Sequence, residues 1–221
     1  MRVEWYGQSA FGLSTADTTV VIDPFGDMSG LSSRGMQFDY PAIEGVAAQL
    51  VLVTHEHLDH NGVEVIAGDP AILRSTAGVL PSPIGEVTAI ASEHDEQAGT
   101  VRGPNTIFVF ELGDLRVCHF GDFGQSALRE EQTAAIGPVD LLFIPVGAGP
   151  TIGAQQARAI VDRLGAGLTV PMHYRTSRIG FLDTADEFLD RSPRVQRLSE
   201  PAFETDQLAA DGPLVVVPAA P

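Results

Sequence analysis

The chain contains no lysine, and all 13 of its basic side chains are arginines. Because 29 residues are acidic, its formal net charge is −16 at pH 7. A surface this acidic repels phosphate backbones, so high-affinity binding of nucleic acid is not expected. Small anionic substrates stay compatible with the sequence, provided that arginines line the pocket that receives them.

Cysteine is nearly absent as well. The single cysteine, Cys118, excludes an intrachain disulfide. It lies in an apolar, strand-like run at residues 115–120, where a free cysteine packs as a small buried hydrophobe. We therefore do not expect Cys118 to be the nucleophile of a thiol hydrolase.

Long apolar runs are also missing. No stretch reaches the ~18–20 residues of a membrane span, and the first residues lack the apolar centre of a signal peptide. These absences predict a cytoplasmic protein with no membrane partner. Its 221 residues, of which 44% are hydrophobic, fit a single domain over residues 1–221.

Short apolar or β-branched runs separated by turn residues predict strands through most of the chain. They lie at residues 3–6, 10–13, 18–22, 50–53, 72–73, 87–91, 106–112, 115–120, 141–146, 168–172 and 214–217. The pair Gly113-Asp114 between two of these runs is a strong hairpin signal.

Helices are predicted mainly in the second half of the chain. One begins at Ser126 and stops at Gly137-Pro138, one spans residues 154–164, and a capping box at Thr184 opens a short third helix. Residues 63–67 suit a helical turn, residues 43–49 a short turn or helix, and residues 27–42 a loop across the mouth of the site. Two groups of strands, each followed by helices, predict an α/β (α+β) fold: an αββα sandwich of two mixed sheets with helices on both outer faces.

The most informative stretch is T-H-E-H-L-D-H, which directly follows the apolar run at residues 50–53. It places His55, His57, Asp59 and His60 within six residues. Imidazole nitrogen and carboxylate oxygen are ligands that zinc and similar divalent metals prefer. In an extended segment His55, His57 and Asp59 would point to one side, and a turn after Leu58 would bring His60 to the same cavity. The alternative is a polar loop whose histidines are solvated, which does not account for this spacing.

Three further residues of the same types lie at strand exits, where binding residues tend to collect. Asp122 occurs in H-F-G-D-F-G, His173 in P-M-H-Y and His94 in S-E-H-D. Each has a simpler alternative: Asp122 as a turn residue, His173 as a solvated surface histidine, and His94 as part of an acidic loop.

Together these segments resemble the metallo-β-lactamase fold superfamily of metal-dependent hydrolases. The opening W-Y-G-Q-S-A-F, with V-I-D-P-F, H-F-G-D-F-G and P-M-H-Y-R-T, is similar to a branch of small bacterial hydrolases that includes the ascorbate-6-phosphate lactonase group. The resemblance covers most of the chain, from the opening strand to the P-M-H-Y segment. Members of that branch usually carry histidine where Gln8 stands, so the role of this position stays open.

The resemblance implies a role for each residue of the motifs. A first metal would be bound by His55, His57 and His94, and a second by Asp59, His60 and His173, with Asp122 bridging both. Asp23, in V-I-D-P-F, would orient a ligand imidazole, although a plain Asp-Pro turn would also account for it. His119 is expected to support the site or the fold rather than to bind metal.

Residues near the predicted ligands are candidates for substrate contacts. These are Arg102, Asn105, Tyr174 and Arg175. The arginines could equally be surface charges.

Two cations that share one water would make hydroxide available near neutral pH and stabilise the developing oxyanion. We therefore expect a metal-dependent hydrolase that opens an ester, lactone or similar bond of a small, in some cases anionic, substrate. Asp59 would position the nucleophile or relay a proton to the leaving group. Zinc is the default metal for a histidine-rich site, with manganese, iron or nickel as alternatives.

Two other functions remain open from the sequence. One is a phosphodiesterase, including an RNA-processing type, against which the net charge argues. The other is a non-catalytic metal-binding protein, against which the full set of predicted ligands argues. A homo-oligomer is expected only because symmetric dimers are common.

Overall fold

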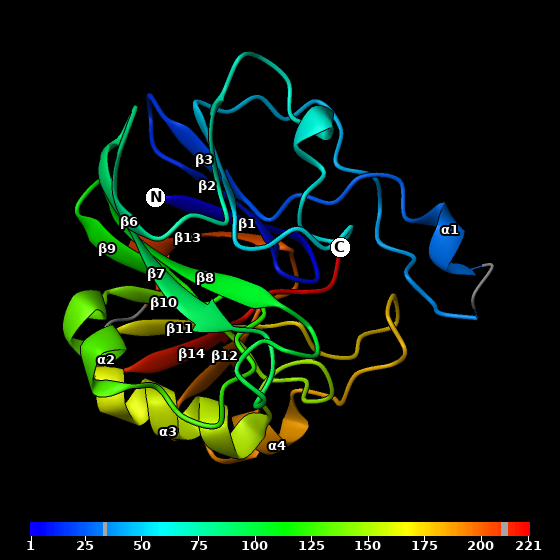
Figure 1. Ribbon diagram of the computed structural model, residues 1–221, viewed down its shortest axis with the longest axis vertical. Helices are drawn as coiled ribbons and strands as arrows, with labels where there is room; N and C mark the ends of the chain where they lie inside the picture. Colours follow the sequence, from blue (N-terminus) through cyan, green and yellow to red (C-terminus); the bar gives the residue numbers. More distant parts are fainter. Residues whose placement is uncertain (33–34, 209–211) are drawn as a thin grey trace.

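Two β-sheets face each other in the computed structural model, which describes residues 1–32, 35–208 and 212–221 (Figure 1). The first sheet has the strand order β13-β1-β2-β3-β4-β5. Its strands are β1 (Arg2–Gly7), β2 (Ala10–Ser14), β3 (Thr19–Ile22), β4 (Leu50–Val53), β5 (Ala71–Arg74) and β13 (Ala202–Glu204). Antiparallel pairing from β13 to β3 gives way to parallel pairing from β3 to β5, so the sheet is mixed.

The second sheet has the order β12-β14-β11-β10-β9-β8-β7-β6. Its strands are β6 (Gly78–Ser82), β7 (Gly85–Glu93), β8 (Pro104–Leu112), β9 (Leu115–His119), β10 (Leu141–Pro145), β11 (Leu168–Met172), β12 (Val195–Arg197) and β14 (Leu214–Val217). The β6–β9 meander is antiparallel and the strands from β9 to β12 are parallel. The predicted architecture of two mixed sheets is therefore confirmed.

Helices are distributed unequally over the two sheets. Figure 1 shows α2 (Glu130–Ile136), α3 (Ala154–Leu164) and α4 (Asp186–Asp190) beside the second sheet. As far as the described residues go, no comparable row of helices covers the first sheet: the 3-10 turn Val63–Val65 and long connections lie beside it, and α1 (Ser29–Ser32) is set off to one side at the end of such a connection. A second short 3-10 turn, Thr205–Gln207, follows β13. No helix among the described residues is long and apolar enough to cross a membrane.

Alternating side chains of β4 show how the layers are held together. Leu50 and Leu52 pack into the main core between the sheets, whereas Val51 and Val53 pack into a second cluster on the outer face of the first sheet. This is the two-sided burial expected of a continuous apolar strand. The outer cluster also contains Phe25, Met28, Phe38, Tyr40 and Ile43. Within residues 27–42, Met28, Phe38 and Tyr40 thus pack against the sheet, whereas most other described residues of the range are exposed; residues 33–34 lie outside the described part of the chain.

Three local predictions were wrong. The helix expected from Ser126 begins at Glu130, where Arg129 and Gln132 form the capping box. The Thr184 hydroxyl donates to the Asp186 carboxylate, and the N-cap residue of α4 is Ala185, without a side-chain cap hydrogen bond, so Thr184 does not cap α4. Residues 43–49 form no helix and instead pair once with the chain at Ala67.

Candidate metal centre

All of the predicted ligands lie at one edge of the sandwich, because they follow the carboxyl ends of strands that converge there. His55 and His60 come after β4, His94 follows β7, Asp122 follows β9 and His173 follows β11. Short polar segments at such strand ends can place side chains from distant parts of the chain around one point.

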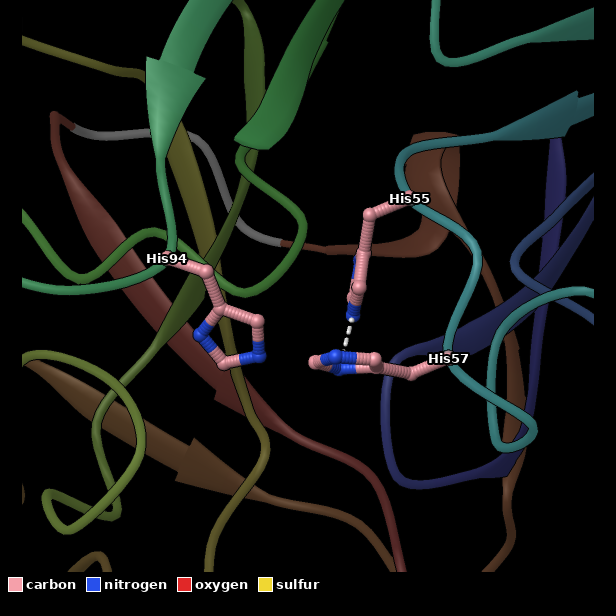
Figure 2. Close-up of side chains that lie close together, drawn as sticks. All are labelled: His55, His57 and His94. Carbon is pink, nitrogen blue, oxygen red and sulfur yellow. Dashed lines mark hydrogen bonds between the residues drawn. The ribbon is translucent and has the colours of Figure 1, made fainter. Parts of the chain in front are cut away.

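The first group is formed by His55, His57 and His94, each of which offers one ring nitrogen within 4.8 Å of the others. Figure 2 shows the three rings pointing toward a common centre. The Nε2 atom of His55 lies 3.0 Å from Nδ1 of His57. His55 and His94 are buried whereas His57 is exposed, so the group opens to solvent on the side of His57.

Asp122 lies at the centre of the whole cluster. Its Oδ2 atom is 3.2 Å from Nε2 of His94, 3.1 Å from Nε2 of His173 and 3.3 Å from Nε2 of His60. The same oxygen lies 4.0 Å from Nε2 of His55. One carboxylate oxygen thus faces imidazoles of both predicted metal-binding groups.

The other group of donors consists of Asp59, His60 and His173. Oδ2 of Asp59 lies 3.5 Å from Nε2 of His60, and that nitrogen is buried without a hydrogen-bond partner among the described residues. A buried polar atom without a partner is costly, so it calls for a bound group at this position. The structure brings both predicted sets together.

Hydrogen bonds at the outer ring edges orient the imidazoles. Nδ1 of His94 donates to the carbonyl of Pro150 at 3.0 Å. The Thr54 hydroxyl donates to Asp23 at 2.8 Å and must therefore accept from Nδ1 of His55, 3.0 Å away. In both histidines the free lone pair is consequently on Nε2, which faces the centre of the cluster.

Burial lowers the pKa values of two histidines in the cluster, whereas neighbouring imidazoles lower the pKa of its central carboxylate. Burial lowers the pKa of His55 to about 2, and it also lowers the pKa of His57. Burial on its own would raise the pKa of Asp122, but the imidazoles of His173 and His60 outweigh it and hold that pKa well below its usual value. His55 and His57 are thus neutral and Asp122 is ionised, as metal binding requires.

The donors present fit divalent metal ions. They are neutral imidazoles and carboxylates, which suit zinc and other borderline cations. The imidazole nitrogens that point inward lie close to one another, and the buried Asp122 carboxylate faces four imidazoles. Protein groups alone do not satisfy all of these buried polar atoms, since Nε2 of His60 has no hydrogen-bond partner among the described residues.

Asp23 lies behind the histidine loop at the end of β3, as predicted. It is fully buried and adopts a left-handed backbone with φ of +48°. Its carboxylate accepts from the backbone N–H and the hydroxyl of Thr54, both at 2.8 Å, and from Nδ1 of His60 at 2.9 Å. A strained backbone conformation of this kind persists only where the surrounding contacts hold the residue in place, as these hydrogen bonds do for Asp23.

Two predicted residues support the Asp122 loop. Asn105 is only 2% exposed, and its amide N–H groups donate to Ser92 and to the Phe120 carbonyl while its Oδ1 accepts from the Asp122 N–H. Its amide is therefore occupied by protein partners, which favours a supporting role; the contact with substrate stays a prediction. His119 donates from Nε2 to the carbonyl of Ser9 at 3.1 Å, away from the inward-facing donors.

The remaining predicted substrate contacts lie around the site without entering its centre. Tyr174 is buried against Trp5, with ring centroids 5.6 Å apart. Arg175 is exposed, and its guanidinium bonds the Leu182 carbonyl in the loop after β11. Arg102 lines a hollow of about 340 Å³ next to Pro150, behind His94.

Sequence reasoning missed the support given by Ser9 and Thr54. The Ser9 hydroxyl donates to Oδ1 of Asp122 at 3.2 Å across 113 positions of sequence. Serine and threonine are not typical metal ligands, and neither residue is part of a spacing pattern that would identify it. Thr54 had one local signal, since it directly precedes the histidine run.

The fold and the clustered donors are those of the metallo-β-lactamase superfamily, and comparison with known proteins confirms that predicted resemblance. The chain belongs to the family described as the beta-lactamase superfamily domain, which matches residues 2–173. A metallo-beta-lactamase superfamily protein of Thermotoga maritima has a structure with a TM-score of 0.78, at 28% identity and with 98% of each chain covered.

Among curated proteins the relatives carry the family name UPF0173. A UPF0173 metal-dependent hydrolase of Methylobacterium nodulans is 30% identical over 221 residues, covering 86% of this chain and 91% of the relative. A UPF0173 protein of Pyrococcus abyssi is 30% identical over 198 residues, covering 80% and 84%. The chain is therefore a UPF0173-type metal-dependent hydrolase. An isothiocyanate hydrolase from Delia radicum gut bacteria, 15% identical with a TM-score of 0.66 over 100% of this chain and 97% of that one, shares the fold alone.

Proposed function

We propose that this hydrolase uses two divalent cations to cleave an ester, lactone or similar bond of a small substrate. The position of Asp122 carries the proposal, because its Oδ2 atom lies 3.2 Å from Nε2 of His94 and 3.1 Å from Nε2 of His173. A carboxylate oxygen between two groups of inward nitrogens is the arrangement expected of a bridging ligand.

The assignment of ligands follows from the two groups. His55, His57 and His94 would hold one cation, and Asp59, His60 and His173 the other, with Asp122 shared. Zinc suits these donors best, and manganese, iron and nickel are the alternatives to be tested. When bound, the cations would supply Lewis acidity and an activated water for attack on a carbonyl carbon.

The protein residues would then orient the reacting groups. Asp59 is the carboxylate of the cluster that is partly exposed, whereas Asp122 is buried. Asp59 is therefore the better placed of the two to hold the attacking water or to pass a proton to the leaving group. Its pKa is lowered: burial alone would raise it, but His60 outweighs that effect, so Asp59 is ionised and can hold the attacking water by accepting a hydrogen bond from it.

Two features favour a small substrate over a polynucleotide. The net charge of −16 opposes phosphate backbones. Leu58, between His57 and Asp59, is 69% exposed and offers an apolar surface at the open side of the cluster. We expect this side chain to contact the carbon skeleton of the substrate, so Leu58→Ser would raise KM more than it changes kcat.

The proposal is tested with protein stripped of metal by a chelator and then reconstituted with zinc or manganese. Close to two cations per chain should bind, and a lactone or ester should be hydrolysed in preference to a phosphodiester chromogen or a structured RNA. Asp122→Ala should abolish most activity and weaken cation binding. The exposed Asp114→Ala, at the hairpin turn between β8 and β9, makes the same charge change and should behave as wild type.

Two other results of this experiment would change the proposed function. Turnover of RNA alone would replace the small-substrate proposal by a nuclease. Stoichiometric metal binding without turnover of any substrate would support a non-catalytic metal-binding protein.

A further inference from the structure

The turn between β1 and β2 brings two consecutive side chains to the two carboxylates of the cluster. Gln8 donates from Nε2 to Oδ2 of Asp59 at 3.4 Å, and Ser9 donates from its hydroxyl to Oδ1 of Asp122 at 3.2 Å. Both Gln8 and Ser9 are fully buried. Neither side chain is an imidazole, carboxylate or thiolate, the donors that zinc prefers, and each can act on a cation through the carboxylate that it contacts.

Backbone contacts hold this turn from several sides. The carbonyl of Gln8 accepts from Nε1 of Trp5 at 3.0 Å and from the backbone N–H of His173 at 3.4 Å. The carbonyl of Ser9 accepts from His119. Gln8 adopts a left-handed backbone with φ of +51°. The turn is thus tied both to the second sheet and to the loop that carries a proposed ligand.

Glycine is required immediately before these residues. Gly7 has φ of +117°, and a Cβ atom there would overlap the ring of Tyr40. Because Tyr40 lies so close to Gly7, the turn packs against the outer cluster, and this limits the conformations open to Gln8 and Ser9. A fixed donor is what a carboxylate needs if one particular oxygen is to face a cation.

The two hydrogen bonds have different consequences. Since Ser9 occupies Oδ1 of Asp122, the oxygen that faces the imidazoles of both groups is Oδ2. Gln8 contacts Asp59, which belongs only to the group with His60 and His173. Its Oε1 atom is buried and has no hydrogen-bond partner among the described residues, so the side chain is held from the amide nitrogen alone.

We propose that Gln8 and Ser9 are positioning residues that set the cation affinity of the centre: Gln8 through Asp59 at one site, and Ser9 through Asp122 at both. This inference rests on the proposed dinuclear function. For Gln8 it predicts a selective effect, because a merely structural defect in the turn would weaken both sites together; for Ser9 it predicts that threonine, which keeps the hydroxyl, restores both affinities.

The experiment is a calorimetric titration of metal-free protein with zinc, which resolves two dissociation constants. The variants Gln8→Met and Gln8→Asn both remove the contact with Asp59, the first by losing the donor and the second by shortening the side chain. Each should weaken the cation at the Asp59 site about 10- to 100-fold and leave the other within about threefold. Ser9→Ala should weaken both, and Ser9→Thr, which keeps the hydroxyl, should restore them.

Matched controls lie in the same sheet or directly beside it, away from the turn. Gln49→Met removes a side chain whose Oε1 accepts from the Thr19 N–H at the start of β3, and Ser14→Ala changes a hydroxyl at the end of β2. Both should titrate as wild type. Thermal unfolding of each metal-free variant, followed by circular dichroism, verifies that it is folded.

Wild-type affinities in folded Gln8 and Ser9 variants would overturn the inference, as would equal losses at both sites in the Gln8 variants. Failure of the wild-type protein to bind two cations would instead overturn the proposed function first. A cobalt titration gives an independent readout, because the visible spectrum of the ion reports its coordination at each site.

Discussion

Oδ2 of Asp23 lies 2.9 Å from Nδ1 of His60 and thereby decides which nitrogen of His60 faces the centre. An ionised carboxylate only accepts hydrogen bonds, so Nδ1 carries a proton and Nε2 is left for binding. The same carboxylate accepts from the Thr54 hydroxyl, which in turn accepts from His55. One side chain at the end of β3 therefore orients imidazoles of both proposed sites.

Asp23→Asn tests this relationship without changing the size of the side chain. The amide can accept at one oxygen only, so it cannot serve both the Thr54 donors and His60. His60 would turn to its other tautomer and present an N–H to the centre. We expect a loss of about 10- to 100-fold in affinity for the cation at the His60 site. Titration calorimetry measures it.

Asp17→Asn is the matched control, since it makes the same change at an exposed turn just before β3. It should leave both affinities unchanged. If Asp23→Asn bound both cations as wild type does, the carboxylate would not fix the tautomer of His60.

Proton release should distinguish the two sites. Burial alone would lower the pKa of His60, but the carboxylates of Asp122, Asp59 and Asp23 outweigh it and raise that pKa well above its usual value. His60 therefore holds its proton to higher pH than an ordinary imidazole in the metal-free protein, and it must lose that proton when its nitrogen binds a cation. His55, with its pKa lowered to about 2, has no proton to lose.

Titrations at pH 8 in buffers of different ionisation enthalpy give the number of protons released. We expect more protons to be released by the cation at the His60 site than by the cation at the His55 site, because the pKa of His60 is raised and the pKa of His55 is lowered. Without metal, the raised pKa of His60 contributes stability below pH ~6.5, which is lost as the pH rises through its folded-state pKa. Equal proton release at both sites would contradict this assignment.

The ligands were predictable because their chemistry is local. Core packing does not account for histidines and a carboxylate spaced closely after a buried strand, and strand exits collect functional side chains. The extended geometry expected for this segment was wrong, however. The chain bends at residues 54, 55 and 57, whereas the expected turn after Leu58 is present, with the His60 N–H bonded to the His57 carbonyl at 3.0 Å. It is this turn, held by Asp23, that brings the rings together.

Features that rest on distant contacts were not predictable. Ser9 and Asp122 are joined across 113 positions, and Asn105 was placed near the substrate because burial cannot be read from its neighbours in sequence. The strands β6, β12 and β13 were missed for a different reason. Pro81 interrupts β6, and the other two strands have three residues each, too few for a periodic pattern.

Asn105→Ala separates a supporting role from a substrate contact. It leaves the Asp122 N–H and the Phe120 carbonyl without the Asn105 amide in a buried region, so we expect a loss of about 1–3 kcal/mol in the free energy of unfolding. Urea unfolding measures this. Ser92→Ala, which removes only one partner of the Asn105 amide, should cost less. A raised KM with unchanged stability would restore Asn105 as a substrate contact.

Gly147→Ala should disturb the position of His173 through its backbone carbonyl. A Cβ atom on Gly147 would overlap the carbonyl oxygen of His173, whose backbone is left-handed with φ of +51°. Since the Gly147 N–H also bonds that carbonyl at 3.1 Å, relief of the overlap would change this contact and with it the position of His173. We expect lower thermal stability and weaker binding of the cation at the His173 site. Gly153→Ala, in the same connection, meets no atom closer than 3.4 Å and should be nearly neutral. Equal behaviour of the two variants would mean that the position of His173 does not depend on this contact.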